Sequence, residues 1–158
     1  MVPFLLPFFQ WSDESFLGAW IRSKTWVFPV IETIHILALT VLFAGIIVID
    51  LRMMGLLMRR MTISRLNQEL NRFVNWAIGV ILVTGAALYS SEALKCFDNP
   101  AFWFKMIFLF LALVFHYTAY RKTARTEQTT TGRGWSVGVL SLLLWFAVGW
   151  GGRGIGFI

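Results

Sequence analysis

Four long apolar segments alternate with polar connectors along the chain. The apolar segments cover about residues 26–50, 73–89, 101–120 and 135–150. Each approaches or exceeds the roughly 20 apolar residues with which a helix crosses a bilayer. This pattern predicts an all-α integral membrane protein, a four-helix bundle that forms a single transmembrane domain in contact with the lipid bilayer.

A short amphipathic segment precedes the first apolar segment. Ser12 is placed to cap a helix over about residues 12–23, in which Asp13 and Glu14 occupy the first turn and Phe16 and Trp20 belong to one apolar stripe. We expect this helix to lie in the membrane interface.

Local signals refine the spans. Ser64 is predicted to cap a helix that leads into the second span, and Pro100 suits the start of the third. Gly134 and Gly138 have the small-xxx-small spacing of closely packed helices. The residues between the second and third spans, SSEALKCFDNP, are predicted to form a polar loop, as are residues 121–134 after the third span. The terminal residues 151–158 are expected to lie along the interface.

Composition supports the membrane assignment. Of the 158 residues, 58% are hydrophobic and 14% are charged, against about 25% charged residues in soluble domains. The single cysteine, Cys96, excludes an internal disulfide and a cysteine-based metal cluster. The net charge of +6 does not indicate a nucleic-acid partner, because the basic residues lie in short connectors between apolar segments.

The basic residues are distributed unequally between the two sides of the predicted bundle. The connectors after the first and third spans carry nine of the 14 arginines and lysines. The positive-inside rule therefore predicts that these connectors are cytoplasmic and that both termini are periplasmic.

Four ionisable side chains lie well inside the predicted spans: Glu32, His35, Lys105 and His116. Glu32 and His35 are three residues apart and share one helical face, and intramembrane ionisable residues usually face a protein interior. We expect Glu32 to pair with a cation, and Lys105, Arg22 and Lys24 are the candidates. The alternative for Lys105 is that it extends to the headgroups.

The only two histidines, His35 and His116, both fall inside spans. One histidine from each of two facing helices suits the axial positions of a low-spin haem b, and Ala44 and Gly45 leave space for a porphyrin among large apolar side chains. However, the helical rise places His116 roughly 8 Å deeper than His35. A single His35 ligand, with Lys105 or an open site opposite, is therefore the competing arrangement. A hydrogen-bonded interhelical histidine is the alternative without a cofactor.

Two sequence motifs resemble known families. His35, followed after seven residues by Phe-Ala-Gly at 43–45, and Trp-Phe-Lys at 103–105, followed after ten residues by His116, are similar to helices of HemJ-type protoporphyrinogen oxidases. They resemble CopD-like copper-resistance membrane proteins more loosely. The overall pattern, with Glu-x-x-His in the first span and Asp-Leu-Arg at 50–52, is similar to an uncharacterised family of small four-span bacterial inner-membrane proteins.

The HemJ resemblance implies a four-helix membrane bundle that binds b-type haem and handles porphyrin, with His35 and Lys105 as its important residues. The N-terminal segment through Lys24 and the presence of Glu32 depart from that pattern. The resemblance therefore bears on haem binding more than on the oxidase reaction.

Three functional hypotheses follow. The first is a haem b protein with an electron-transfer or porphyrin-related redox role, whose candidate cofactor-binding residues are His35, His116, Lys105 and Glu32. The second is a non-catalytic accessory subunit that packs against other membrane protein subunits, or forms a homo-oligomer. The third, a proton or ion pathway built on Glu32, His35 and Lys105, ranks last because four helices leave little room for a gated path. Whether the protein is an enzyme stays open.

Overall fold

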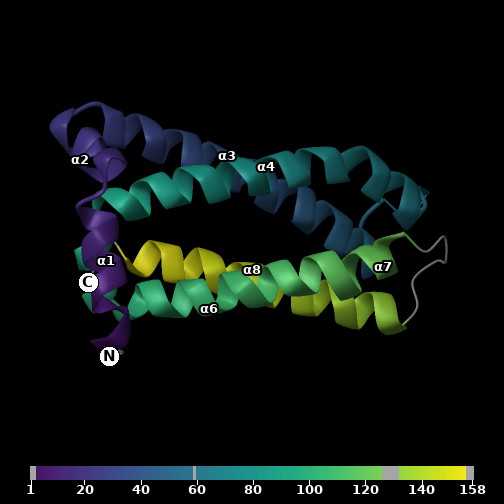
Figure 1. Cartoon of the computed structure of the whole chain (residues 1–158). Helices are drawn as coiled ribbons and strands as arrows, with labels where there is room; N and C mark the ends of the chain where they lie inside the picture. The colour runs from purple at the N-terminus through teal and green to yellow at the C-terminus, as the bar shows by residue number, and fades with distance from the viewer. Residues whose placement is uncertain (1–2, 59, 126–131, 156–158) are drawn as a thin grey trace.

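Helices account for every regular element in the described part of the chain, which confirms the all-α fold. The structure, a computed structural model, describes residues 3–58, 60–125 and 132–155. Four helical segments are long and apolar enough to cross a membrane: α3 (Val27–Met53), α4 (Ile63–Ser91), the segment Pro100–Ala124 and α8 (Gly132–Gly154). They run alternately up and down (Figure 1). The chain is therefore a multi-pass membrane protein.

The third spanning segment changes its helical type along its length. It consists of α6 (Pro100–Phe115), the π-helical turn η2 (His116–Tyr120) and the short α7 (Arg121–Ala124). The Asn99 side chain caps α6 by accepting the backbone N–H of Ala101 at 2.9 Å, and Pro100 occupies the first position, as predicted. π-Helical turns are rare and are frequent at functional sites.

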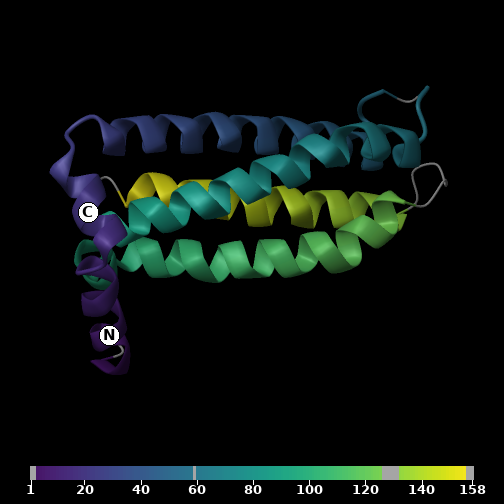
Figure 2. The same ribbon diagram turned by 45° about the horizontal axis from the view of Figure 1, so that its top comes forward.

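The spanning helices pack in two pairs. α3 lies beside α4 and α6 lies beside α8, while α3 also contacts α8 (Figures 1 and 2). Leu42 and Ile46 of α3, Ile78 of α4, Ala112 of α6 and Trp145 of α8 are among the buried residues of the central core. Outward-facing side chains on all four helices are large, apolar and exposed, and this surface suits contact with lipid.

Two glycines bring α8 close to α3, which confirms the predicted small-xxx-small contact. A Cβ atom added at Gly134 would lie 3.2 Å from the carbonyl oxygen of Met53, and one added at Gly138 would lie 3.1 Å from that of Asp50. The absence of side chains lets the two backbones approach each other. This contact fixes the level at which α8 meets the end of α3.

The N-terminal segment forms two helices, and the amphipathic helix predicted over 12–23 begins later than predicted, at Phe16. After a 3₁₀ turn, η1 (Pro3–Leu5), the helices α1 (Leu6–Asp13) and α2 (Phe16–Ser23) lie across one end of the bundle (Figures 1 and 2). Ser12 is buried within α1. Ser15, in an extended conformation, is the cap instead, because its hydroxyl accepts the N–H of Gly18 at 3.2 Å.

The helix that contains the second span begins at Ile63, ten residues before the predicted span. Thr62, not Ser64, is its cap, since the Thr62 hydroxyl accepts the N–H of Arg65 at 3.3 Å. The polar residues 64–72 continue the helix beyond its most apolar part, because hydropathy marks the membrane-buried part of a helix rather than its capped end. The predicted loop before the third span contains the short helix α5 (Ala93–Asp98).

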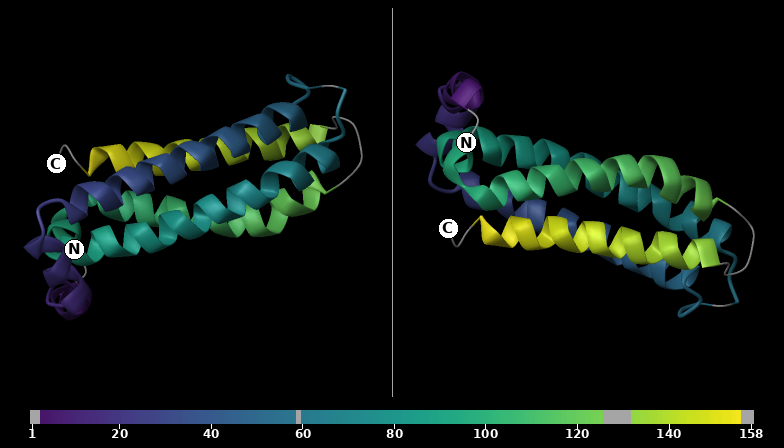
Figure 3. Two further views of the ribbon diagram at one scale, coloured as in Figure 1. Left: turned by 90° about the horizontal axis from the view of Figure 1, so that it is seen from above. Right: turned by 90° about the horizontal axis from the view of Figure 1, so that it is seen from below.

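The α3–α4 connection and the end of α7 lie at one end of the bundle, which we call the connector end. Both termini lie at the opposite end, with α1, α2 and α5 (Figures 1 and 3). Residues 121–125 of the predicted polar connector form α7 and a turn, and residues 151–154 of the predicted tail complete α8. The rest of the predicted connector, 126–131, and the last three residues of the tail lie outside the described residues.

Candidate functional site

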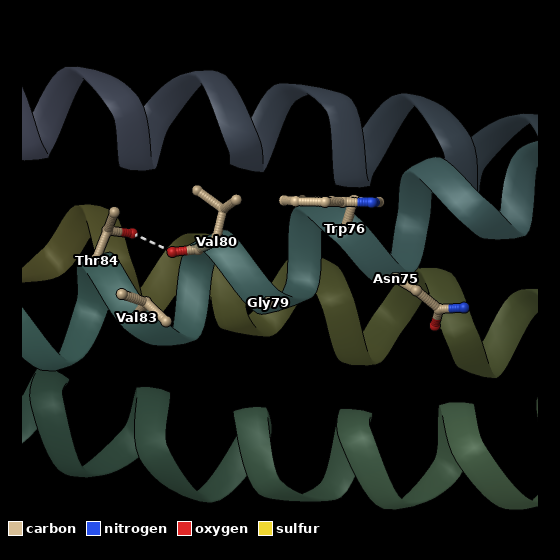
Figure 4. A pocket seen from close by; sticks show the side chains of 6 residues that line it. All are labelled: Asn75, Trp76, Gly79, Val80, Val83 and Thr84. Carbon is tan, nitrogen blue, oxygen red and sulfur yellow. Dashed lines mark hydrogen bonds between the residues drawn. The ribbon is translucent and has the colours of Figure 1, made fainter.

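His35 is buried between α3 and α4, with 8% of its surface exposed. Gly85 of α4 leaves room for the ring, because a Cβ atom there would lie 3.3 Å from Cε1 of His35. The Nδ1 atom of His35 lies 2.7 Å from Oγ1 of Thr84. The Thr84 hydroxyl in turn lies 2.6 Å from the carbonyl oxygen of Val80, to which it donates (Figure 4).

These two contacts select one tautomer of His35. A threonine hydroxyl has a single hydrogen, and in Thr84 that hydrogen is used in the bond to Val80. Thr84 therefore accepts its second hydrogen bond from Nδ1–H of His35. The Nε2 atom is left unprotonated in neutral imidazole, with its lone pair available to bind a metal ion or to accept a proton.

Lys105 of α6 is the cation whose charge acts on His35. The positive charge of Lys105 acts electrostatically on His35, where it disfavours the imidazolium form, and on Cys96 of α5. Its ammonium nitrogen lies 3.8 Å from the position that a Cβ atom of Gly152 in α8 would occupy. Along the helix axes, His35 lies about 12 Å and Lys105 about 8 Å from the first residues of α3 and α6. The fold therefore brings these two predicted residues to similar depths.

His116 lies in the other half of the bundle and does not face His35. About 24 Å of helix separates His116 from the start of α6, so the two histidines differ in depth by about 12 Å. His116 is 2% exposed and stacks on Tyr120, with ring centroids 4.8 Å apart. The edge of Trp145 packs against it. These residues do not fit a haem held between two histidines.

The space predicted beside Gly45 is also filled. A Cβ atom at Gly45 would lie 2.6 Å from a methyl group of Val74 in α4. Gly45 therefore serves the packing of α3 on α4, and it does not leave room for a porphyrin at that level.

Glu32 is exposed on the side of α3, and within the described residues it makes no ion pair. The prediction that it faces the interior with a cationic partner is wrong. Three residues rotate a helix by about 300°, so the Glu32 and His35 side chains diverge by about 60°. Arg22, one predicted partner, instead donates to the carbonyl oxygens of Asp13 and Ser91, at 2.6 and 2.9 Å.

A second polar group, which the sequence pattern did not reveal, lies toward the connector end. Asp50 of α3 is fully buried, and Tyr120 of η2 and Ser141 of α8 are each 1% exposed. Both hydroxyls lie near the Asp50 carboxyl group. Neither carboxyl oxygen and neither hydroxyl, however, makes a well-formed hydrogen bond in the structure. We call these three residues, with His116 beside Tyr120, the Asp50 cluster.

The sequence contained a weak signal for this cluster. Asp50 and Arg52 belong to the Asp-Leu-Arg motif at the end of the first predicted span. Both Asp50 and Arg52 are in fact buried, and Nε of Arg52 donates to the carbonyl oxygen of Met61 at 2.6 Å. The position of Asp50, three residues before the last residue of the long apolar helix α3, is the sequence feature that could have indicated a buried carboxyl group.

The outer face of α4 carries a shallow hollow of about 500 Å³ centred on Gly79 (Figure 4). Its lining residues Trp76 and Val83 are largely exposed, and nothing lies within 4 Å of a Cβ atom placed at Gly79. The hollow therefore opens outward, away from the central core. Among the described residues, no group of three or more His, Cys, Asp or Glu side chains is arranged to hold a metal ion.

Comparison with known proteins gives one match. No curated protein and no solved structure matches the chain, so the resemblance to HemJ-type oxidases and CopD-like proteins has no support from relatives. The expected membership of an uncharacterised family is supported. A model of a family of unknown function matches residues 8–158, which is almost the whole chain, and the protein therefore belongs to that family, DUF6644.

Proposed function

We propose that this protein binds haem b in the membrane through His35 and has a redox role, in electron transfer or in porphyrin chemistry. The hydrogen bond between His35 and Thr84 is the observation that carries the proposal. Metal-ligating histidines almost always donate their second ring N–H to a neighbouring acceptor, which fixes the ring and its tautomer. His35 already has that acceptor in Thr84. In this tautomer the Nε2 atom carries the lone pair that would bind the haem iron.

The residues around His35 have distinct parts in this proposal. Thr84 orients the imidazole, Gly85 gives it room, and the apolar core excludes water from it. Lys105 would be the candidate for a second ligand of the haem iron. Bound haem would supply the one-electron chemistry, while the protein supplies the ligand and the low-dielectric surroundings. His116 and Glu32 have no part in holding the haem in this arrangement.

The test is a visible spectrum of the protein purified in mild detergent, with a pyridine haemochrome assay on the same sample. We expect near-stoichiometric b-type haem in the natural protein and none in His35→Ala. His116→Ala is the matched control, and we expect it to retain the haem and its spin state. Lys105→Ala should change the spin state if Lys105 is the second ligand. A folded protein with unchanged haem content in His35→Ala would overturn the proposal.

A second candidate function, that of an accessory subunit in a larger membrane complex or homo-oligomer, is favoured by Glu32. A carboxylate on the outer side of a spanning helix is costly in lipid, and the exposed apolar residue Ile36 lies one turn further along the same face of α3. A polar or cationic partner would remove that cost. Pull-down from membranes in mild detergent should recover a stoichiometric partner with the natural protein and lose it with Glu32→Leu. Equal recovery with both proteins would count against this function.

We infer that the connector end faces the cytoplasm of a bacterium and that the termini face the periplasm. The fold supports the inference because the end of α3 and the end of α7, beside which Arg60 and Arg125 stand in the sequence, lie at one end of the bundle (Figure 1). Positively charged connectors are retained on the cytoplasmic side during insertion.

A further inference from the structure

Asp50 makes no ion pair in the described structure, and the Nη1 atom of the buried Arg52 also lacks a hydrogen-bond partner. The carboxyl group of Asp50 is fully buried. Arg52, two residues further along α3, directs its Nε to Met61. An ionised carboxylate buried without a partner costs several kcal/mol by typical estimates. A single positive charge bound at Asp50 would remove this cost.

The neighbours of Asp50 decide which positive charge fits. A hard metal cation takes about six or more oxygen ligands. The Asp50 cluster offers the two carboxyl oxygens and the hydroxyls of Tyr120 and Ser141, while the carbonyl groups inside the surrounding helices are used by the helical hydrogen bonds. A proton needs no such shell, because a protonated carboxyl group donates one hydrogen bond and accepts others.

Other titratable groups near Asp50 are few. Within η2 they are Tyr120 and His116, and both ring nitrogens of His116 lack a hydrogen-bond partner. On α7, Arg121 acts electrostatically on His116. From α4, the apolar side chains of Ile63 and Leu66 pack against Tyr120. From α8, Ser141 and Trp145 face the cluster.

Asp50 lies close to the connector end of the bundle. Asp50 lies about 5 Å along the helix axis from Met53, the last residue of α3. The close contact of Gly138 with the Asp50 carbonyl group holds α8 over this end of α3. His116 is one layer deeper, stacked on Tyr120.

We propose that Asp50, Tyr120, Ser141 and His116 form a buried proton-binding site near the connector end. Asp50 binds and releases the proton. Binding converts the carboxylate to a neutral carboxylic acid whose O–H donates to a neighbouring oxygen, and release returns the proton to water and restores the carboxylate. No electron moves and no other bond changes. The site does not depend on haem at His35, because the two centres lie in opposite halves of the bundle.

Infrared difference spectroscopy of the protein in lipid nanodiscs tests the site, because a protonated carboxyl group has a carbonyl band that a carboxylate lacks. We expect such a band, shifted in D₂O, to disappear in Asp50→Asn and to titrate reversibly with pH in the natural protein. Asp98→Asn, which changes an exposed aspartate of α5, is the matched control and should keep the band. Tyr120→Phe and His116→Gln should retain the band but move its titration midpoint, which a purely structural carboxyl group would not show.

Two outcomes would overturn the proposal. The first is an identical carbonyl region in the natural protein and in folded Asp50→Asn at every pH at which both stay folded. The second is a band that neither titrates nor exchanges in D₂O, which would make Asp50 a permanently protonated structural residue. If Asp50→Asn does not fold, the titration midpoint in Tyr120→Phe decides the question. A shifted midpoint supports proton exchange at Asp50, and an unchanged carbonyl band at every pH supports a permanently protonated structural residue.

Discussion

A Cβ atom placed at Gly138 of α8 would lie only 3.1 Å from the backbone carbonyl oxygen of Asp50 in α3. This contact joins the two helix pairs at the level of the Asp50 cluster. A side chain at this position would have to separate α3 from α8, and the burial of Asp50 would be lost with it.

Substitution of Gly138 by leucine should therefore destabilise the bundle. We expect Gly138→Leu to lower the free energy of unfolding by about 3 kcal/mol, because overpacking forces the backbone to move. Gly79→Leu is the matched control: Gly79 faces open space on α4, so its substitution should change stability by less than about 0.5 kcal/mol. Steric trapping or denaturant titration in detergent would measure both. Equal stability of the two variants would contradict the close approach of α8 to α3.

Thr84 should control haem affinity without contacting the iron. Thr84→Val keeps the shape of the side chain but removes the acceptor for Nδ1–H of His35, so we expect haem affinity to fall about 10- to 100-fold. Thr84→Ser keeps the hydroxyl and should retain the affinity. Haem titration of the apoprotein, followed by absorbance, gives the dissociation constants. Equal constants for valine and serine would show that this hydrogen bond does not orient a ligand.

Cys96 of α5 should be a slow nucleophile at neutral pH. Burial raises the pKa of the Cys96 thiol to about 11, and the negative charge of Glu92 contributes to the increase. The alkylation rate should rise about tenfold per pH unit and level off only near this value, because the thiolate is the reacting form. Iodoacetamide labelling followed by mass spectrometry measures the rate. In Glu92→Gln the curve should move to lower pH.

The same raised pKa predicts a loss of stability in alkaline solution. Unfolding returns the thiol to its ordinary pKa of about 8.5. Between that value and about 11, the folded state holds more protons than the unfolded state, so the free energy of unfolding falls as the pH rises. Cys96→Ser should remove this part of the pH dependence, and an unchanged profile in that variant would assign it to other groups.

The orientation in the membrane can be measured with single cysteines in a Cys96→Ser background. Lys24 and Arg125 are exposed at opposite ends of the bundle. We expect Lys24→Cys to react with a membrane-impermeant maleimide in intact cells, and Arg125→Cys to react only after lysis. The reverse pattern would place the basic connectors outside the cytoplasm and contradict the proposed topology.

The sequence by itself determined the parts of the structure that depend on local properties. Hydropathy and length located the four spans, because a bilayer requires long apolar helices whatever their partners are. Asn99-Pro100 marked a helix start, since a cap acts on its own first turn. The spacing of Gly134 and Gly138 indicated a close helix contact, although not which helix would meet them.

Only the tertiary structure decided which side chains meet. Glu32 and His35 are close in sequence, yet the rotation of α3 in the bundle buries His35 against Thr84 and leaves Glu32 outside. His35 and His116 matched in type but not in depth. Asp50 became a buried centre because α8 and η2 cover it with Ser141 and Tyr120. A helical sequence fixes the relative directions of its side chains, but the packing of its neighbours fixes which direction is inward.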